Sequence, residues 1–445
     1  MKKRLLSVLA LSATVTFATP PQVQGEESKT LLDDTAPGRT VDQFISAGET
    51  SGEIGITTRW ESPDDGDSDD GGVAYFEPKW TSGKVHNLQF TIGGLITSRI
   101  WEDDTMVTGS YPDSQDGLLT EAYLTYSLPG TKTRFVLGRA DDGIFYEPVQ
   151  GDGDFYEGLG VRIDDIPRMT LHAHAVTAWL DNADTNPVSW DGLNNTGGGD
   201  DRWQDMDKVI QDQTGIQKDS GNAAYTVALE TEVLKDDLLN MTAALISLED
   251  VARSWSIAAD SEVSLSNEVS IGVQGVFATL QEDTPASVND TDEDVDQYKI
   301  YGFTNVRGLE LGLGHYGQSD DRSVFNTRAE GGDDFEAVFV GDDFNPTDED
   351  LAKYGEQPNN NTYFVNAAWG YGPANLQVIY AWVDDAVIEN GTLKEGEAQE
   401  LNVILDLAWT ETLSSEFYYA KVDDDYTQDG DRSTDIFAMN LTHEF

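Results

Sequence analysis

The most constraining feature of this sequence is the way its connections alternate in length. From residue 53 onward the chain divides into 18 short segments in which apolar and polar residues alternate, which is the period of a β-strand. Long acidic joints such as 181–221 and 318–361 take turns with tight ones such as Ser82–Gly83 and Arg307–Gly308. Apolar and polar residues also alternate within the strands of a soluble β-sandwich. In a sandwich, however, nothing requires long and short loops to alternate along the chain.

Short turns on one rim and long loops on the other are typical of outer-membrane β-barrels. We therefore predict an all-β fold, a transmembrane antiparallel β-barrel of 18 strands with short periplasmic turns and long acidic extracellular loops. A count of 16 strands is the alternative, if the segments near 249–262 merge. The predicted strands are 53–61, 73–81, 86–102, 117–128, 133–140, 155–164, 169–180, 222–233, 238–248, 252–262, 267–280, 296–306, 308–317, 362–370, 374–384, 398–410, 414–422 and 433–445.

The N-terminus has the form of an export signal. The basic residues of Met1–Arg4 precede an apolar run from Leu5 to Ala18, which is too short to span a membrane as a helix. We predict a signal peptide over 1–25, an N-terminal periplasmic lead over 26–52 and the barrel over 53–445.

Aromatic residues gather where a membrane protein needs them. The last predicted strand alternates through Phe437, Met439 and Leu441 and ends in Phe445, which resembles the C-terminal strand of bacterial outer-membrane proteins. Other aromatic residues lie near strand ends, where girdles of such residues meet the membrane interfaces. These tryptophans are Trp60, Trp80, Trp101, Trp179, Trp255, Trp369, Trp382 and Trp409. The predicted location is the outer membrane of a Gram-negative cell.

Composition excludes several functions. The formal net charge of −55 over 445 residues would repel the phosphates of a nucleic acid. Without cysteine the chain has no disulfide framework, no thiolate metal site and no cysteine nucleophile.

Three short segments resemble OprD-like porins and the related major outer-membrane porins of epsilonproteobacteria. They are Thr40–Ile54, with its Ser-Gly-Glu-Ile strand start, Phe135–Ala140, with a Gly-Arg strand end, and Phe155–Val161, with a Glu-Gly strand start. The resemblance implies an 18-stranded diffusion channel, often a homotrimer, in which the loop over 140–154 folds into the pore as its constriction.

Candidate constriction residues follow from this resemblance and from strand parity. The loop carries acids and an aromatic residue, namely Asp141, Asp142, Tyr146, Glu147, Asp152 and Asp154. Parity turns four basic residues inward from the wall, namely Arg59, Lys79, Arg99 and Arg162. Acids facing bases across a pore would make a transverse field that orients polar solutes. The alternative is that these bases only solvate the lumen.

We therefore expect a water-filled porin for passive diffusion of small hydrophilic solutes and ions, with a preference for cations. Adaptation to a saline habitat explains the acidity equally well. The expected partners are outer-membrane lipid, lipopolysaccharide, solutes and cations. No cofactor is expected, although weak binding of Ca²⁺ or Mg²⁺ by the acidic loops stays open. His172 and His174 lie on the lumen face of one strand, where ordinary polar lining is a better interpretation than a metal site.

Two other classes of function compete with the porin. A secreted, adhesin-like acidic β-protein that binds calcium would tolerate the loops, but it does not require their alternation or the terminal aromatic residue. An outer-membrane barrel enzyme would need a nucleophile and a base at a rim, and the five histidines lie near no evident set of this kind. We expect no enzymatic activity.

Overall fold

The computed structural model describes the strands and tight turns of the chain. The described residues are 44–45, 47–63, 69–102, 118–141, 155–180, 204–205, 223–234, 238–248, 252–282, 295–318, 361–389, 392–424 and 432–445. The predicted signal peptide and most of the 140–154 loop lie outside them. No helix among the described residues is long and apolar enough to cross a membrane.

The strands follow the predicted pattern closely, and the first begins at Glu49, slightly before the predicted start at residue 53. The strands are β1 (Glu49–Pro63), β2 (Asp69–Thr81), β3 (Leu88–Glu102), β4 (Leu118–Ser127), β5 (Arg134–Asp141), β6 (Phe155–Ile166), β7 (Met169–Leu180), β8 (Gln204–Asp205), β9 (Ala224–Leu234), β10 (Leu239–Leu248), β11 (Ala252–Ser266), β12 (Val269–Glu282), β13 (Val295–Val306), β14 (Leu309–Gln318), β15 (Asn361–Tyr371), β16 (Ala374–Glu389), β17 (Thr392–Ala408), β18 (Leu413–Asp424) and β19 (Arg432–Glu444).

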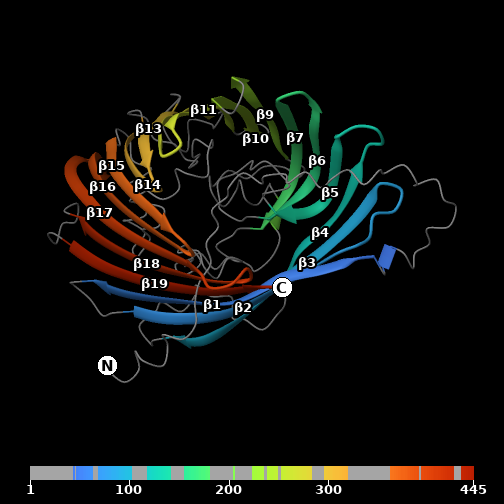
Figure 1. Ribbon diagram of the computed structural model, residues 1–445, viewed down its shortest axis with the longest axis horizontal. Coiled ribbons are helices and arrows are strands. Elements are labelled where there is room, and N and C mark those ends of the chain that lie inside the picture. Colours follow the sequence, from blue (N-terminus) through green and yellow to red (C-terminus); the bar gives the residue numbers. More distant parts are fainter. Residues whose placement is uncertain are drawn as a thin grey trace.

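These strands close into one antiparallel barrel (Figure 1). Each long strand pairs with its neighbours in the sequence, and β1 pairs with β19 from Glu53 opposite Glu444 to Pro63 opposite Thr434. Among the described strands, the two-residue β8 pairs with the end of β7 alone, while β7 continues to β9. The predicted 18-stranded barrel is therefore confirmed, with β8 as a small addition beside β7.

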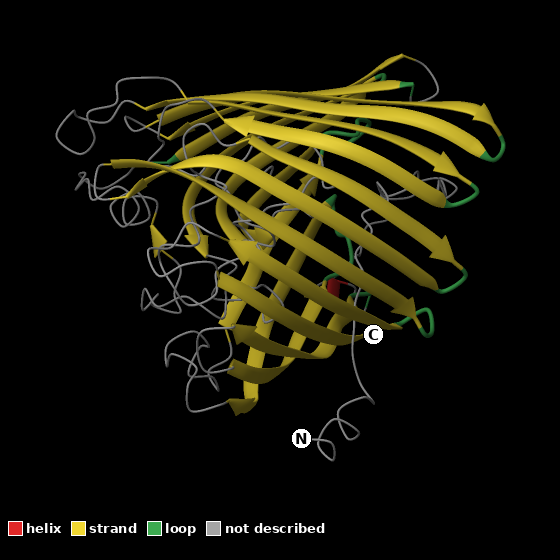
Figure 2. Cartoon of the chain, turned by 90° about the vertical axis from the view of Figure 1, so that its left-hand side faces the viewer, coloured by secondary structure: helices red, strands yellow, loops and turns green. Residues whose placement is uncertain are grey.

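The two rims differ, as the alternating joints predict. Tight turns gather at one rim, which we call the turn rim (Figure 2). Several need a left-handed backbone, for example at Arg168 and at Arg307–Gly308. The opposite rim, the loop rim, carries the other connections. The predicted long joint over 385–397 is wrong, because β16 and β17 continue through it and pair as far as Glu389 opposite Thr392. Val387 and Ile388 are β-branched residues, which favour an extended strand there.

The two faces of the wall are sorted by polarity. Large apolar side chains such as Leu137, Leu159 and Leu313 point outward, and Leu313 is 68% exposed. The side chains at the alternate positions of each strand point into the barrel, and many of them are polar. This is the inverse of a soluble protein, and it is what a barrel with a hydrocarbon exterior and a wet interior requires.

The seam between β1 and β19 is tied from both faces. Inside, the Tyr75 hydroxyl lies 2.6 Å from the Thr442 hydroxyl, and its ring crosses Gly55, where a Cβ would collide with it. Outside, the Phe445 ring stacks on Phe76 with centroids 5.9 Å apart. These contacts join β2 to β19 across β1 and so lock the seam.

Candidate functional site

Basic residues that were predicted to point inward lie on the inner face of the barrel wall. Arg59 is 2% exposed on the inner face of β1, and Lys79 and Arg162 lie on the inner faces of β2 and β6. The side chain of Arg99 is outside the described set, but its backbone lies opposite the inward-facing Val73. Arg59, Lys79 and Arg162 therefore lie on the face that strand parity predicts, whereas the inward orientation of Arg99 stays a prediction.

The structure does not bring these bases to one level. The positions of Arg59 and Arg99 lie toward the loop-rim ends of β1 and β3, whereas Lys79 and Arg162 lie toward the turn rim. Asp141 is the last residue of β5, opposite Phe155, at the loop rim. The side chain of Asp141 lies outside the described residues, as do Asp142, Tyr146, Glu147, Asp152 and Asp154, so their role in a constriction stays a prediction.

Lys79 has a carboxylate partner on the wall. Its Nζ lies 2.6 Å from Oε1 of Glu121 on β4, and the Glu121 side chain is only 6% exposed. Gly93 on β3 lies between the two strands, and a Cβ there would press on the Glu121 carboxylate. A glycine at this position lets the ion pair span β3.

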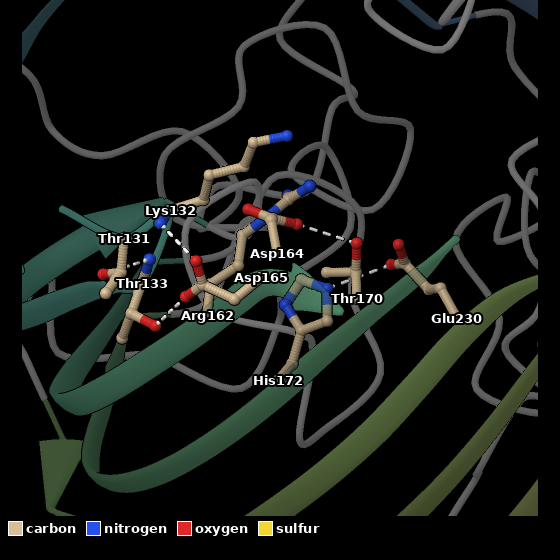
Figure 3. A network of polar contacts seen from close by, with 9 residues as sticks. All are labelled: Thr131, Lys132, Thr133, Arg162, Asp164, Asp165, Thr170, His172 and Glu230. Carbon is tan, nitrogen blue, oxygen red and sulfur yellow. Dashed lines mark hydrogen bonds and ion pairs between the residues drawn. The ribbon is translucent and has the colours of Figure 1, made fainter. Parts of the chain in front are cut away.

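A row of nitrogen-bearing side chains crosses β5, β6 and β7 near the turn rim. Figure 3 shows its members on β6 and β7, Arg162 and His172. Arg134 lies opposite Arg162, which lies opposite His172. Two of the three hold carboxylates, since Arg162 Nε is 3.0 Å from Asp164 and His172 Nε2 is 3.1 Å from Glu230. The charge of Arg162 is therefore balanced by Asp164 within the row.

The same region is braced at its edge (Figure 3). The Thr170 hydroxyl donates to Asp164 over 2.7 Å. Asp165 accepts from the Thr133 hydroxyl at 2.6 Å and from the backbone N–H of Lys132 at 2.8 Å. These bonds tie the β5 and β7 ends to β6 and hold the Arg162 side of the wall in place.

An acidic row that the sequence did not reveal lies on the opposite side of the ring, on β17 to β19 (Figure 1). Asp406 and Glu416 occupy directly opposite positions on β17 and β18. Asp406 accepts from Asn375 over 3.0 Å, and Glu416 accepts from Asn440 over 3.0 Å. Within the described part of the chain, neither carboxylate forms an ion pair.

The lumen thus has two unlike walls. Among the described residues, no group of three or more His, Asp or Glu side chains gathers as a metal site would require. His172 contacts Glu230, and the rings of His172 and His174 meet edge to face at 6.0 Å. The charged side chains of the two walls can attract, repel and orient charged solutes.

Comparison with known proteins agrees with this geometry. A family model described as Campylobacter major outer membrane protein matches residues 98–441. The chain belongs to that family. It is an outer-membrane protein, and its barrel forms a channel for the diffusion of small solutes. No curated protein sequence matches this porin.

Solved porin structures share the fold of this family member at low sequence identity. The BenF-like porin of Pseudomonas fluorescens Pf-5 is 12% identical with a TM-score of 0.67, covering 90% of this chain and 99% of its own. Pseudomonas aeruginosa OpdQ is 13% identical with a TM-score of 0.64 over the same shares. P. aeruginosa OpdK, solved with vanillate, is 13% identical with a TM-score of 0.65, again covering 90% and 99%.

The Lys79–Glu121 pair gives the porin a testable structural dependence. Replacing Lys79 by methionine is expected to lower the free energy of unfolding by roughly 2 kcal/mol, because it leaves the buried Glu121 without its cation. The urea midpoint of the refolded barrel measures this. The double variant K79M/E121Q, which removes both charges, is expected to recover most of the loss. A double variant as unstable as K79M would show that the pair is not the cause.

Proposed function

We propose that this porin prefers cations. We propose further that the charged side chains on the inner face of its strands set this preference. The observation that supports this is an imbalance of partners. Lys79, Arg162 and His172 each face a carboxylate, whereas Asp406 and Glu416 face no cation among the described residues.

Other charged side chains in the lumen also support a preference for cations. Glu53 lies opposite Glu77 across β1 and β2, on the inward face. On the other side, Arg134 has no ion-pair partner in the described part of the chain, but it stands at the first position of β5, on the turn rim. The balance along the described wall is negative, so cations are concentrated and anions repelled within a Debye length of about 8–10 Å.

The barrel is wide enough for this wall to act through water. A barrel of about 16–18 strands cannot fill its interior with wall side chains and leaves an aqueous channel. Passage is then controlled by the charges that line the channel. Because Asp406 and Glu416 face the Arg162 side, the field runs across the pore as well as along it, and it would orient dipolar solutes. We propose that the acids of the 140–154 loop add to this field.

A planar bilayer experiment tests the proposal. Refolded protein under a KCl gradient is expected to give stable current steps with a reversal potential that favours K⁺. The preference should weaken as the salt concentration rises, because screening shortens the reach of the wall charges. A reversal potential that favours Cl⁻ would contradict the cation preference and leave the channel intact.

We further propose that the mature protein begins after residue 25, acts as a homotrimer in contact with lipopolysaccharide, and carries out transport without catalysis or a cofactor. The resemblance to OprD-like porins supports the trimer, and the signal-like sequence of Met1–Ala18 supports the cleavage. Cross-linking of protein in native outer-membrane vesicles and N-terminal sequencing test the two statements separately.

A further inference from the structure

A row of polar side chains crosses the outer face of β9 to β12, one residue from the loop-rim end of each strand. Tyr225 on β9 lies opposite Ser247 on β10, and Ser247 lies opposite Arg253 on β11. Arg253 in turn lies opposite Gln281 on β12. The row shares its face with the exposed Leu245, two residues before Ser247, so it points away from the lumen. We call it the outer polar row.

The outer polar row lies at the edge of the apolar belt of the barrel. Directly beneath it, on the side of the turn rim, Val227 lies opposite Leu245, and Leu245 lies opposite Trp255. All three side chains are exposed, and the Trp255 ring packs on Phe277 with centroids 5.4 Å apart. Such outward apolar residues contact the hydrocarbon of the membrane. The row therefore lies at the headgroup level of the outer leaflet, because the loop rim faces the cell exterior.

Arg253 is a base without an acid. Its side chain is exposed, and it forms no ion pair or side-chain hydrogen bond among the described residues. Arg139 on β5 and Lys421 on β18 also stand on the outer face near the loop rim, but Arg139 Nε is 2.6 Å from Glu157 and Lys421 Nζ is 3.2 Å from Asp423. In a chain with a formal net charge of −55, an outward base that no acid neutralises points to an anion outside the protein.

The neighbours of Arg253 add hydroxyl groups to the same row. Within the described part of the chain, neither Tyr225 nor Ser247 forms a side-chain hydrogen bond. A guanidinium group can hold two phosphate oxygens at once, and hydroxyl groups can donate to or accept from the hydroxyls of a sugar. Four neighbouring strands span about 14 Å, at ~4.8 Å from one strand to the next. One extended headgroup could therefore contact the whole row.

We propose that the outer polar row is a docking site for the phosphorylated sugar headgroup of lipopolysaccharide. Arg253 binds a phosphate, Tyr225 and Ser247 bind the sugar, and the acyl chains lie on the apolar surface around Leu245 and Trp255. A phospholipid would satisfy the guanidinium but leave much of the row without a partner. The site deepens the proposed contact of this porin with lipopolysaccharide and rests on it.

The experiment measures binding of purified lipid A, the lipid moiety of lipopolysaccharide, to the refolded barrel in mixed detergent micelles. A chelator is present, so that divalent ions do not bridge carboxylates to phosphate. Thermal stabilisation as a function of lipid A concentration gives the apparent affinity. Arg253→Gln is expected to bind lipid A about tenfold more weakly, because it loses a charge-assisted hydrogen bond to phosphate. Arg253→Lys is expected to lie between the two, since lysine keeps the charge but not the planar fork.

Lys421→Gln is the matched control, because it also removes a base from the outer face near the loop rim. Lys421 is already paired with Asp423, so this variant is expected to keep the wild-type affinity for lipid A. Two further lipids test the chemistry of the headgroup on the wild-type protein. Lipid A without its phosphates is expected to bind about tenfold more weakly than intact lipid A. Phosphatidylglycerol, which carries a phosphate but no sugar, is also expected to bind more weakly.

Three results would overturn the site. They are an Arg253→Gln protein that binds lipid A as tightly as wild type, a Lys421→Gln protein that is weakened equally, and wild-type binding of phosphatidylglycerol as tight as that of lipid A. A wild-type protein that binds no lipid A would overturn the proposed contact with lipopolysaccharide as well. The K⁺ preference is measured separately by the reversal potential, so its failure is distinguishable from failure of this site.

Discussion

Replacement of Gly52 by valine is expected to stop the barrel from closing. Gly52 has a φ of +149°, and a Cβ at this position would collide with the backbone carbonyl oxygen of Glu77 on β2. Its own carbonyl accepts the backbone N–H of Phe445 at 3.0 Å. A branched side chain would therefore disturb both strands that flank β1. We expect a loss of more than about 4 kcal/mol in the free energy of unfolding, enough to abolish refolding.

Refolding into detergent, followed by the shift between heated and unheated protein on gels, measures this. Gly130→Asn is the control. Gly130 also has a positive φ, of +76°, but a Cβ there meets nothing within 4 Å, and asparagine tolerates this backbone region. The control is expected to refold normally. A Gly52→Val protein that refolds as well as the control would show that β1 can shift to relieve the collision.

The second large effect is a change of ion selectivity when the partners of the basic row are removed. In the double variant D164N/E230Q, Arg162 and His172 keep their places but lose their carboxylates. The Arg162 side of the lumen becomes positive. We expect the K⁺ over Cl⁻ permeability ratio to fall about three- to tenfold, which corresponds to roughly 1 kcal/mol, the scale of a charge pair in water.

A rim variant separates the lumen effect from a general loss of acids. Glu268 pairs with Arg307 in two turns of the turn rim, where both side chains are exposed, and Glu411 lies exposed in the turn between β17 and β18. The double variant E268Q/E411Q removes the same number of carboxylates from the rim. It is expected to leave the permeability ratio within about twofold of wild type. Equal shifts in both double variants would assign selectivity to overall charge.

Much of the architecture could be predicted from local pattern. Alternation fixed which side of β1, β2 and β6 carries Arg59, Lys79 and Arg162, because a strand has only two faces. The alternation of joint lengths predicted the two rims. The one misplaced loop, 385–397, failed because its acids resembled those of the true loops, while the apolar residues in Ala386–Ile388 carried the weaker strand signal.

The acidic row could not be predicted in the same way. Asp406, Glu416 and Asn440 are neighbours only because three strands pair in one particular register. A shift of one residue in that register would turn Asp406 to the outer face of the wall, away from the lumen. The partners of the basic residues depend on register too, as with Glu230 on β9 beside His172 on β7. The register of each strand pair depends on packing between segments that are distant in the sequence. It therefore cannot be predicted from the sequence of one segment alone.

The pairing of β1 with β19 also has a consequence for how the protein is made. The first and last strands hold each other's edges, so the ring stays open until the far end of the chain has arrived. Until then β1 exposes a row of unpaired backbone groups, the kind of edge that invites aggregation. Contacts between such distant segments also form slowly. The entropy of closing a large loop is lost before these contacts can stabilise the fold. We therefore expect the chain to be most prone to aggregation before this seam has formed.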